Sequence, residues 1–250
     1  MLLATSSAGV GALLRRQIRQ AHRAIGALAA GESWPAAARG VEVGTEQAPR
    51  LRLVLLGDSS GVGLGARRPE DTLGHRLLSR LASAGYGARL DVVAVSGADA
   101  RDLAGQVEEA LVLAPHVAVV SVGGNDVTHR LRPRAAGRLL GAAVARLRTG
   151  GAQVVVATCP DLGAVRRLGR PLRWWAGVAS RREWRSQRAA ASRAGAVVVG
   201  VGRQLGPAFA RDAGMFSADG FHPSSTGYAA LADTLWPAVL AAAERQCGPR

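Results

Sequence analysis

The sequence predicts an α/β protein, a three-layer α/β/α sandwich around a five-stranded parallel sheet, with an N-terminal helical arm before it. From Arg50 onward, short apolar runs alternate with longer segments of helical period, as they do where helices connect parallel strands. The length of 250 residues and the hydrophobic content of 48% are those of an ordinary globular protein with one substantial core. We therefore expect a single sheet with helices on both faces.

The predicted strands and helices alternate along the chain. The strand candidates are residues 51–56, 89–95, 116–122, 153–158 and 196–201. The helix candidates between them are residues 72–84, 99–113, 133–148 and 174–194, and a last helix covers about residues 225–243. Right-handed crossovers between the strands then stack these elements into three layers.

Residues 1–49 are expected to form an N-terminal arm and linker before the sheet domain of residues 50–250. Apolar residues and arginines between about residues 8 and 30 predict a helix, which either packs on the domain or lies on an anionic membrane. Residues 31–49 are rich in Gly, Pro, Ala and Glu and have no sustained period, which indicates a linker.

The beginning of the sequence bears on where the protein acts. Residues 1–14 are apolar and precede the first arginines, the reverse of the charge order in a secretory signal peptide. The stretch is also shorter than the roughly 20 residues of a membrane-spanning helix. We expect a cytoplasmic protein, with peripheral membrane contact through the N-terminal arm as an open alternative.

The formal net charge is +14, and arginine supplies all of the positive charge because the chain has no lysine. The arginines are dispersed, often in pairs such as Arg15-Arg16 and Arg181-Arg182, without interleaved aromatic residues or a nucleic-acid-binding motif. This distribution predicts a solvated basic surface and no specific nucleic-acid partner.

A glycine-rich turn that carries Ser59 and Ser60 follows the first predicted strand. Because open parallel sheets bind ligands at the carboxyl ends of their strands, Ser59 has the position of a nucleophile. A helix-capping serine or a phosphate cradle would occupy the same position. The turn lacks the Gly-Lys-Ser/Thr ending of a P-loop and the G-x-G-x-x-G spacing of a dinucleotide site.

Hydrogen-bond donors follow the next two predicted strands. Gly97 comes after the second strand and Asn125 after the third, and each taken singly is also a common turn residue. The backbone N–H groups of Ser59 and Gly97 and the amide of Asn125 would together give three donors around one point, as the oxyanion of an acyl-transfer intermediate requires.

Asp219 and His222 lie three residues apart on a loop before the last predicted helix. At that spacing the carboxylate can accept from one imidazole nitrogen while the other nitrogen faces the serine. An isolated pair of this kind is also compatible with a solvated Asp and a capping His.

Taken together, these residues resemble the four blocks of the SGNH (GDSL-type) hydrolase family. The blocks are Gly57-Asp58-Ser59, Gly97, Gly123-x-Asn125-Asp126 and Asp219-x-x-His222, in the family's order and within residues 50–243. The resemblance implies the flavodoxin-like SGNH hydrolase fold for residues 50–250. It implies neither a metal nor an organic cofactor.

The resemblance also assigns roles to individual residues. Ser59 is the implied nucleophile and first oxyanion donor, Gly97 and Asn125 are the other donors, and His222 is the base that Asp219 orients. Asp58 and Asp126 are expected to support the site. The implied reaction is hydrolysis of a small-molecule ester, thioester or lipid ester through an acyl-enzyme on Ser59.

Three other interpretations use the same residues. An acyltransferase would resolve the acyl-enzyme with an alcohol or sugar and would keep the same triad. A catalytically silent binding module would keep only the fold. The G-x-S-x-G elbow of α/β-hydrolases fits residues 57–61, but it requires several strands before the serine and a well-separated acid and His.

The acyl pocket has the weakest signal. We expect residues 160–163, together with Trp174, Trp175 and Trp184, to form a lid or an acyl-binding wall. The alternative is that these tryptophans pack a surface helix on the core. The arginines between residues 166 and 173 either meet a phosphate-bearing acyl donor or face water.

Overall fold

The computed structural model describes residues 16, 38–44 and 50–247. Its centre is one six-stranded sheet of order β1-β3-β2-β4-β5-β6. The strands are β1 (Val41–Val43), β2 (Arg50–Gly57), β3 (Gly87–Val92), β4 (Val117–Ser121), β5 (Gln153–Ala157) and β6 (Val197–Val199). Strands β2 to β6 are mutually parallel, so the five predicted strands are confirmed, with ends that differ by a few residues.

The sixth strand corrects the sequence-based prediction. β1 pairs antiparallel with β3 at the edge of the sheet, in a segment that was expected to be a linker. Val41 and Val43 pack against the core beside β3. A strand of three residues is too short to give a periodic pattern, and it forms because the edge of β3 offers backbone hydrogen bonds. Apart from Arg16, the helix predicted at about residues 8–30 lies outside the described residues.

The helices connect the strands as the alternating pattern predicts. They are α2 (Ser59–Val62), α3 (Leu73–Ser83), α4 (Leu103–Val112), α5 (Gly124–Thr128), α6 (Pro133–Thr149), α7 (Leu172–Arg193), α8 (Val201–Arg211) and α9 (Ser225–Cys247), with 3₁₀ turns η1 (Pro69–Asp71), η2 (Leu162–Ala164) and η3 (Ala213–Met215). All five predicted helices form. None of the helices in the described part of the chain is long and apolar enough to cross a bilayer.

Helix α8 was missed by the sequence analysis. Its eleven residues include Gly202, Gly206 and Pro207, three residues that oppose helix formation and normally indicate a loop. The fifth strand was therefore predicted to run to Val201, although Val201 begins the helix. This error matters because α8 forms part of the wall of the candidate site.

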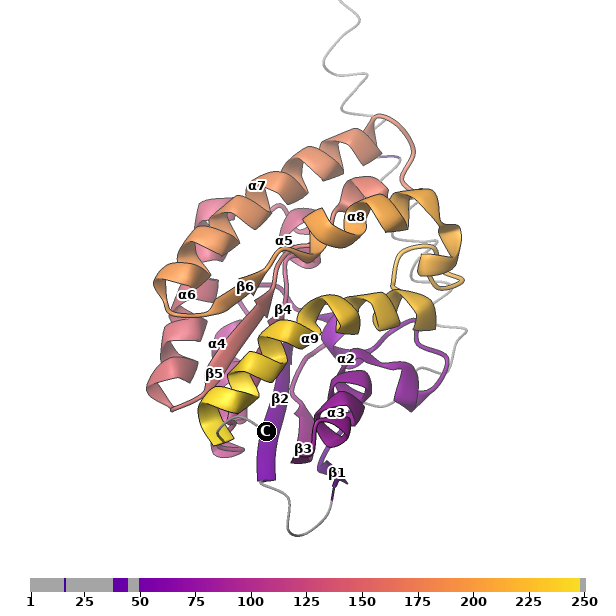
Figure 1. The fold of residues 1–250 in the computed structure, drawn as a ribbon. Helices are drawn as coiled ribbons and strands as arrows, with labels where there is room; N and C mark the ends of the chain where they lie inside the picture. Colours follow the sequence, from indigo (N-terminus) through magenta and orange to yellow (C-terminus); the bar gives the residue numbers. More distant parts are fainter. Residues whose placement is uncertain (1–15, 17–37, 45–49, 248–250) are drawn as a thin grey trace, which may run out of the picture.

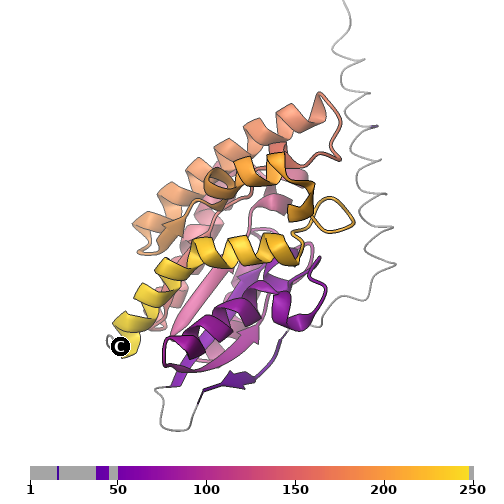
Figure 2. The ribbon, with the colours of Figure 1, turned by 45° about the vertical axis from the view of Figure 1, so that its right-hand side comes forward.

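The sheet has an apolar core on each face, and alternation along β2 divides its side chains between them. Leu53 and Leu55 belong to the cluster under α3 and α9, whereas Val54 and Leu56 belong to the cluster under α4 and α6. Helices α3 and α9 lie side by side on the first face in both ribbon views (Figure 1 and Figure 2). Helix α7 packs chiefly on α6. The predicted three-layer α/β/α sandwich is confirmed.

Candidate active site

The turn after β2 puts Ser59 at the carboxyl end of the sheet. Gly57 has φ +126, and a Cβ at this position would lie 1.8 Å from the carbonyl oxygen of Ser121, so only glycine fits. The side chain of Gln106 fixes the same turn through bonds of 2.7 and 2.9 Å to the N–H and C=O of Gly57. Asp58 then caps α2 by accepting from Ser60 N at 2.9 Å. Ser59 is therefore the first residue of a short helix.

Ser59, His222 and Asp219 form a continuous hydrogen-bonded chain. The Oγ of Ser59 lies 3.0 Å from Nε2 of His222, and Nδ1 of His222 lies 2.5 Å from Oδ2 of Asp219. Ser59 and His222 are 8% and 7% exposed and Asp219 is fully buried. The sequence predicted these three residues, and the fold brings them together although 163 positions separate Ser59 from His222.

The carboxylate of Asp219 is held by several donors besides His222. Its Oδ1 accepts from the backbone N–H groups of Phe221 and His222 at 2.7 and 2.9 Å and from Oγ of Ser217 at 2.7 Å. Burial by itself would raise the pKa of Asp219, but these hydrogen bonds and the bond to His222 outweigh it and lower the pKa to about 2. The carboxylate is thus ionised and fixed in position.

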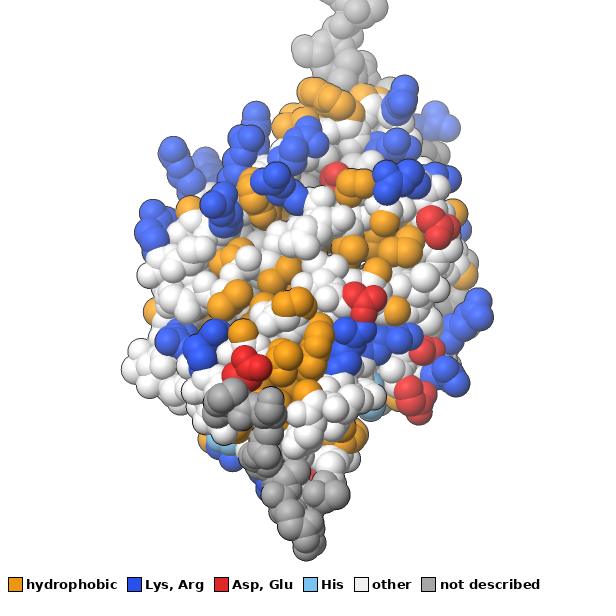
Figure 3. Space-filling view, viewed as in Figure 1, with side chains coloured by type: hydrophobic (Ala, Val, Ile, Leu, Met, Phe, Trp, Pro, Cys, Tyr) orange, Lys and Arg blue, Asp and Glu red, His pale blue; other side chains and the backbone are white. Residues whose placement is uncertain are grey.

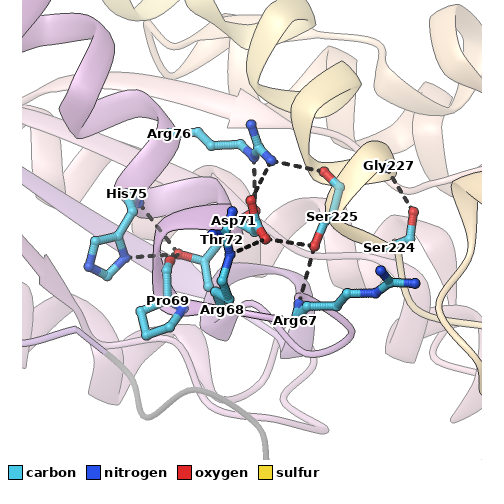
Figure 4. A network of polar contacts seen from close by, with 10 residues as sticks. All are labelled: Arg67, Arg68, Pro69, Asp71, Thr72, His75, Arg76, Ser224, Ser225 and Gly227. Atoms are coloured by element: carbon cyan, nitrogen blue, oxygen red, sulfur yellow. Dashed lines mark hydrogen bonds and ion pairs between the residues drawn. The ribbon is translucent and has the colours of Figure 1, made fainter.

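A polar network holds the chain immediately after His222, where α9 begins (Figure 4). The Oγ of Ser225 donates to Oδ2 of Asp71 at 3.0 Å, and Arg76 bridges Oδ1 of Asp71 at 2.8 Å and the carbonyl oxygen of Ser225 at 3.2 Å. The N–H of Arg67 donates to Ser225 Oγ at 3.2 Å. The segment between α2 and α3 therefore clamps the first turn of α9, three residues beyond His222.

Asp71 and Ser225 were not identified from the sequence. Burial by itself would raise the pKa of Asp71, but hydrogen bonds from Ser225 and Arg68 and the positive charges of Arg68 and Arg76 lower it. The spacing of these residues gave no signal, because the contact joins segments that are 154 positions apart.

The three predicted oxyanion donors follow three neighbouring strands: Ser59 begins α2 after β2, Gly97 lies in the loop after β3, and Asn125 lies in α5 after β4. Among the described residues, the backbone N–H groups of Ser59 and Gly97 have no acceptor. The Nδ2 of Asn125 donates one hydrogen to the carbonyl oxygen of Ala98 at 2.9 Å, which leaves its second N–H for another acceptor. Gly97 has φ +83 and is exposed, so its backbone is accessible to a ligand.

Asp126 joins the loop of Gly97 to α5. Its Oδ1 accepts from the N–H of Ala100 at 2.8 Å, and Nδ1 of His129 lies 2.8 Å from Oδ2 of Asp99 in the same region. Asp126 is fully buried, and its Oδ2 has no partner in the described structure. Burial accordingly raises the pKa of Asp126 to about 6, and burial also raises the pKa of Asp58 to about 6.

An apolar hollow of about 100 Å³ opens beside Ser59 and His222. Its apolar wall comes from the chain after β5, from α8 and from the segment after η3: Leu162, Val165, Leu205, Phe209, Phe216 and Phe221. Phe209 and Phe216 pack edge to face with centroids 4.9 Å apart. The chain has only three phenylalanines, and all three line this hollow. Their grouping just before His222 was the signal that the sequence analysis overlooked.

The prediction of the acyl wall was right in one part and wrong in another. Residues 160–162 line the hollow as expected. Trp174, Trp175 and Trp184 do not line it: the first two are exposed, and the third packs under the guanidinium of Arg203, 4.9 Å from the ring centroid. The tryptophans do not reach the hollow because α7, which carries them, packs chiefly on α6.

In the described part of the chain, no group of three His, Cys, Asp or Glu side chains has the geometry to hold a metal ion. Cys159 is buried and its pKa is raised well above the ordinary value by burial. Its Sγ donates to the carbonyl oxygen of Gly123 at 3.3 Å, which fits a packing role under α5.

The fold and the hydrogen-bonded chain Ser59–His222–Asp219 resemble those of SGNH-type hydrolases. The model of the GDSL-like lipase/acylhydrolase family matches residues 55–230. The chain therefore belongs to this family, and the resemblance found in its four sequence blocks is confirmed.

Individual relatives agree with the family assignment. The GDSL-like esterase Rv1075c of Mycobacterium tuberculosis is 39% identical over 193 residues, which are 76% of this chain and 62% of that protein. Among solved structures, TesA gives a TM-score of 0.64 at 23% identity over 76% of this chain and 99% of TesA. A lipase/acylhydrolase from Enterococcus faecalis gives 0.59 at 19% identity over 75% and 94% of the two chains. These structural likenesses show the shared fold.

Proposed function

We propose that this protein hydrolyses carboxylic esters through an acyl-enzyme on Ser59. The observation that carries the proposal is the unbroken chain from Ser59 Oγ to His222 Nε2 at 3.0 Å and from His222 Nδ1 to Asp219 Oδ2 at 2.5 Å. Membership of a family of lipases and acylhydrolases supports it, as does the name of the esterase relative.

In the first half of the reaction, Ser59 Oγ attacks the ester carbonyl carbon while His222 Nε2 takes the hydroxyl proton. The ionised Asp219 holds the imidazole and stabilises the imidazolium that forms. The carbonyl oxygen becomes an oxyanion and accepts from the N–H groups of Ser59 and Gly97 and from Asn125 Nδ2. When the tetrahedral intermediate collapses, the proton on Nε2 passes to the departing alcohol and the acyl group stays on Oγ.

In the second half, water takes the place of the alcohol. His222 Nε2 removes a proton from the water as its oxygen attacks the acyl carbon, and the same three donors stabilise the second intermediate. Collapse returns the proton to Ser59 Oγ and releases the carboxylic acid. The cycle needs no redox change and regenerates the starting enzyme.

The hollow indicates which part of the substrate lies where. Its three phenylalanines and neighbouring aliphatic side chains favour the acyl portion, because burying apolar surface is worth roughly 25 cal/mol per Å². We therefore propose small-molecule esters with an apolar acyl group as substrates, and thioesters and lipid esters belong to the same class of acyl donors.

The test is a panel of aryl esters and acyl thioesters of increasing chain length, assayed with and without an added alcohol. We expect turnover of the aryl esters, a maximum at one acyl length set by the hollow, and loss of turnover in Ser59→Ala. If the acyl group passes to the alcohol in preference to water, the protein is an acyltransferase and the proposal of hydrolysis is wrong. Absence of turnover across the panel would contradict the proposal.

A further inference from the structure

A second hollow lies next to the active site, at the beginning of α7. We call it the α7 hollow; it has a volume of about 490 Å³ and is lined by Asp161, Gly163, Arg170, Pro171, Arg173, Trp174, Gly177 and Arg181. Asp161 also lines the apolar hollow beside Ser59, so the two hollows adjoin. None of the roles assigned above uses the α7 hollow.

The α7 hollow has an excess of positive charge. Three arginines line it against one carboxylate, Asp161, whose Oδ1 already accepts from the N–H of Gly163 at 2.9 Å. Within the described residues, the guanidinium groups of Arg173 and Arg181 have no hydrogen-bond or ion-pair partner. The first turn of α7 contains no acidic residue. Unpaired guanidinium groups of this kind suit the oxygen atoms of phosphate groups.

Two large aromatic side chains lie at the beginning of α7, and the first of them, Trp174, lines the same hollow. Trp174 is 67% exposed and Trp175 is 54% exposed, and they are the exposed aromatic side chains of the described part of the chain. Burying an aromatic side chain of this size removes about 150–250 Å² from water, so leaving two of them exposed side by side forgoes a sizeable stabilisation. Adjacent exposed tryptophans indicate a surface that binds a membrane or another molecule.

The position of the α7 hollow relates it to substrate entry. α7 follows β5 and η2, so it begins at the carboxyl end of the sheet, where the candidate active site lies. In Figure 3, arginine side chains gather over the upper part of this face, where Figure 1 shows α7 and α8, with hydrophobic side chains between them. The active-site hollow and the basic, tryptophan-bearing surface therefore share one end of the molecule.

We propose that the α7 hollow, together with Trp174 and Trp175, docks on the surface of an anionic lipid bilayer. Lipid phosphates bind Arg173 and Arg181, and the two indole rings lie at the level of the headgroups, where tryptophan is enriched in membrane proteins. A soluble phosphate ester would account for the arginines and leave the outward-facing tryptophans unexplained. The net charge of +14 favours the same partner, because an anionic bilayer attracts a basic protein.

The experiment measures binding of the full chain to vesicles of phosphatidylcholine with and without phosphatidylglycerol. Ser59→Ala is the background, so that lipid turnover does not interfere and the result is independent of the proposed activity. Three variants are compared on this background: Arg173→Ala/Arg181→Ala, Trp174→Ala/Trp175→Ala, and the control Arg134→Ala/Arg138→Ala. The control removes the same charge from exposed positions on α6.

We expect binding to the anionic vesicles and little to pure phosphatidylcholine. Removing Arg173 and Arg181 should weaken the partition coefficient by roughly 30-fold, since each basic residue near an anionic surface contributes about a factor of five to six. The tryptophan variant should bind more weakly and lose the blue shift of fluorescence that the parent shows with vesicles. The α6 control should bind as the parent does within a few-fold.

Two outcomes would overturn the proposal. Equal binding of the α7 and α6 arginine variants would assign any vesicle binding to another part of the chain. Displacement of the parent by millimolar inorganic phosphate, with no effect of the tryptophan substitutions, would identify a site for soluble phosphate. The same substitutions are also made in the protein that retains Ser59. Unchanged melting temperatures and an unchanged rate of hydrolysis of a short soluble ester would show that these variants remain folded.

Discussion

Two buried aspartates near the candidate site have pKa values shifted in opposite directions. Asp219 and Asp126 are both fully buried, yet the pKa of Asp219 is lowered to about 2 and that of Asp126 is raised to about 6. Asp219 accepts four hydrogen bonds, two of them from the backbone N–H and Nδ1 of His222, whereas Asp126 accepts one and leaves Oδ2 without a partner in the described structure. Burial is common to both, so the donors around each carboxylate decide the direction in which its pKa shifts.

The difference separates two tasks. Asp219 faces the base and must be an anion to stabilise the imidazolium. Asp126 only holds the backbone of the Gly97 loop, through Ala100, and a neutral carboxyl accepts that hydrogen bond as well. The following predictions test this division, from the largest expected effect to the smallest.

Removing the charge of Asp219 should have the largest effect on catalysis. Asp219→Asn keeps the shape but allows the wrong tautomer of His222, and kcat should fall by roughly 10³–10⁴-fold. Asp126→Asn is the matched control and should keep kcat within about tenfold, because an amide oxygen also accepts from Ala100 N. Steady-state kinetics on an aryl ester measure both, and similar losses in the two variants would contradict the comparison.

Asn125, next to Asp126 in α5, is expected to contribute through its side-chain amide. Asn125→Ala removes one oxyanion donor, and kcat should fall by roughly 10²–10³-fold with a much smaller change in KM. The substitution also removes the bond to Ala98, so the melting temperature is measured in parallel. An unchanged kcat in a folded variant would show that the hole is built from other donors.

The pH dependence of stability should have opposite signs for the two aspartates. The pKa of Asp219 is lowered, so its stabilisation is complete above about pH 4 and is lost as the pH falls through 2, which amounts to about 2 kcal/mol. The pKa of Asp126 is raised, so the folded state loses about 3 kcal/mol relative to the unfolded chain as the pH rises from about 4 through 6.

Denaturant titrations at several pH values measure these slopes. As the pH rises from 4 to 6, the free energy of unfolding of Asp126→Asn should increase relative to that of the parent. As the pH rises from 2 to 4, the free energy of unfolding of Asp219→Asn should decrease relative to that of the parent. The difference between variant and parent isolates each carboxylate from Asp58, whose pKa is also raised to about 6. Slopes of the same sign would refute the assignment of charge states.

A third carboxylate, Asp71, should have the smallest effect on catalysis. Asp71→Asn weakens the clamp on Ser225, so the loop of His222 becomes less well fixed and kcat should fall by roughly tenfold at most. Asp233→Asn is the control, since Asp233 pairs with Arg80 on the surface of α9 away from that clamp. Equal kcat values for the two variants would limit the clamp to a structural role.

The sequence predicted the parts of the fold that repeat a pattern over many residues. Strands β2 to β6 and helices such as α3 and α6 have clear apolar periods, so they were predicted within a few residues. β1 has three residues, and α8 contains two glycines and a proline, so neither has a readable pattern. Both form because of tertiary contacts, which local propensity does not include.

The same division holds for the candidate site. Ser59 and Asn125 were predicted because short motifs follow the carboxyl ends of strands, where a parallel sheet gathers its ligand-binding residues. Asp219 and His222 were predicted from their spacing of three residues on the loop before the last helix. Phe209 and Phe216, which line the hollow, were missed because they depend on how α8 and η3 fold back over that edge. Such a wall is fixed by packing between distant segments, and its sequence signal is limited to the grouping of the three phenylalanines before His222.

The central claim is that Ser59 is the nucleophile, and a fluorophosphonate probe tests it most directly. The reagent phosphonylates an activated serine, and mass spectrometry of the digested protein locates the adduct. Ser60→Ala serves as the control because Ser60 adjoins Ser59 and lines the same hollow. We predict one adduct, on Ser59, in the parent and in Ser60→Ala, and none in Ser59→Ala. Equal labelling of Ser59→Ala and the parent would contradict the assignment.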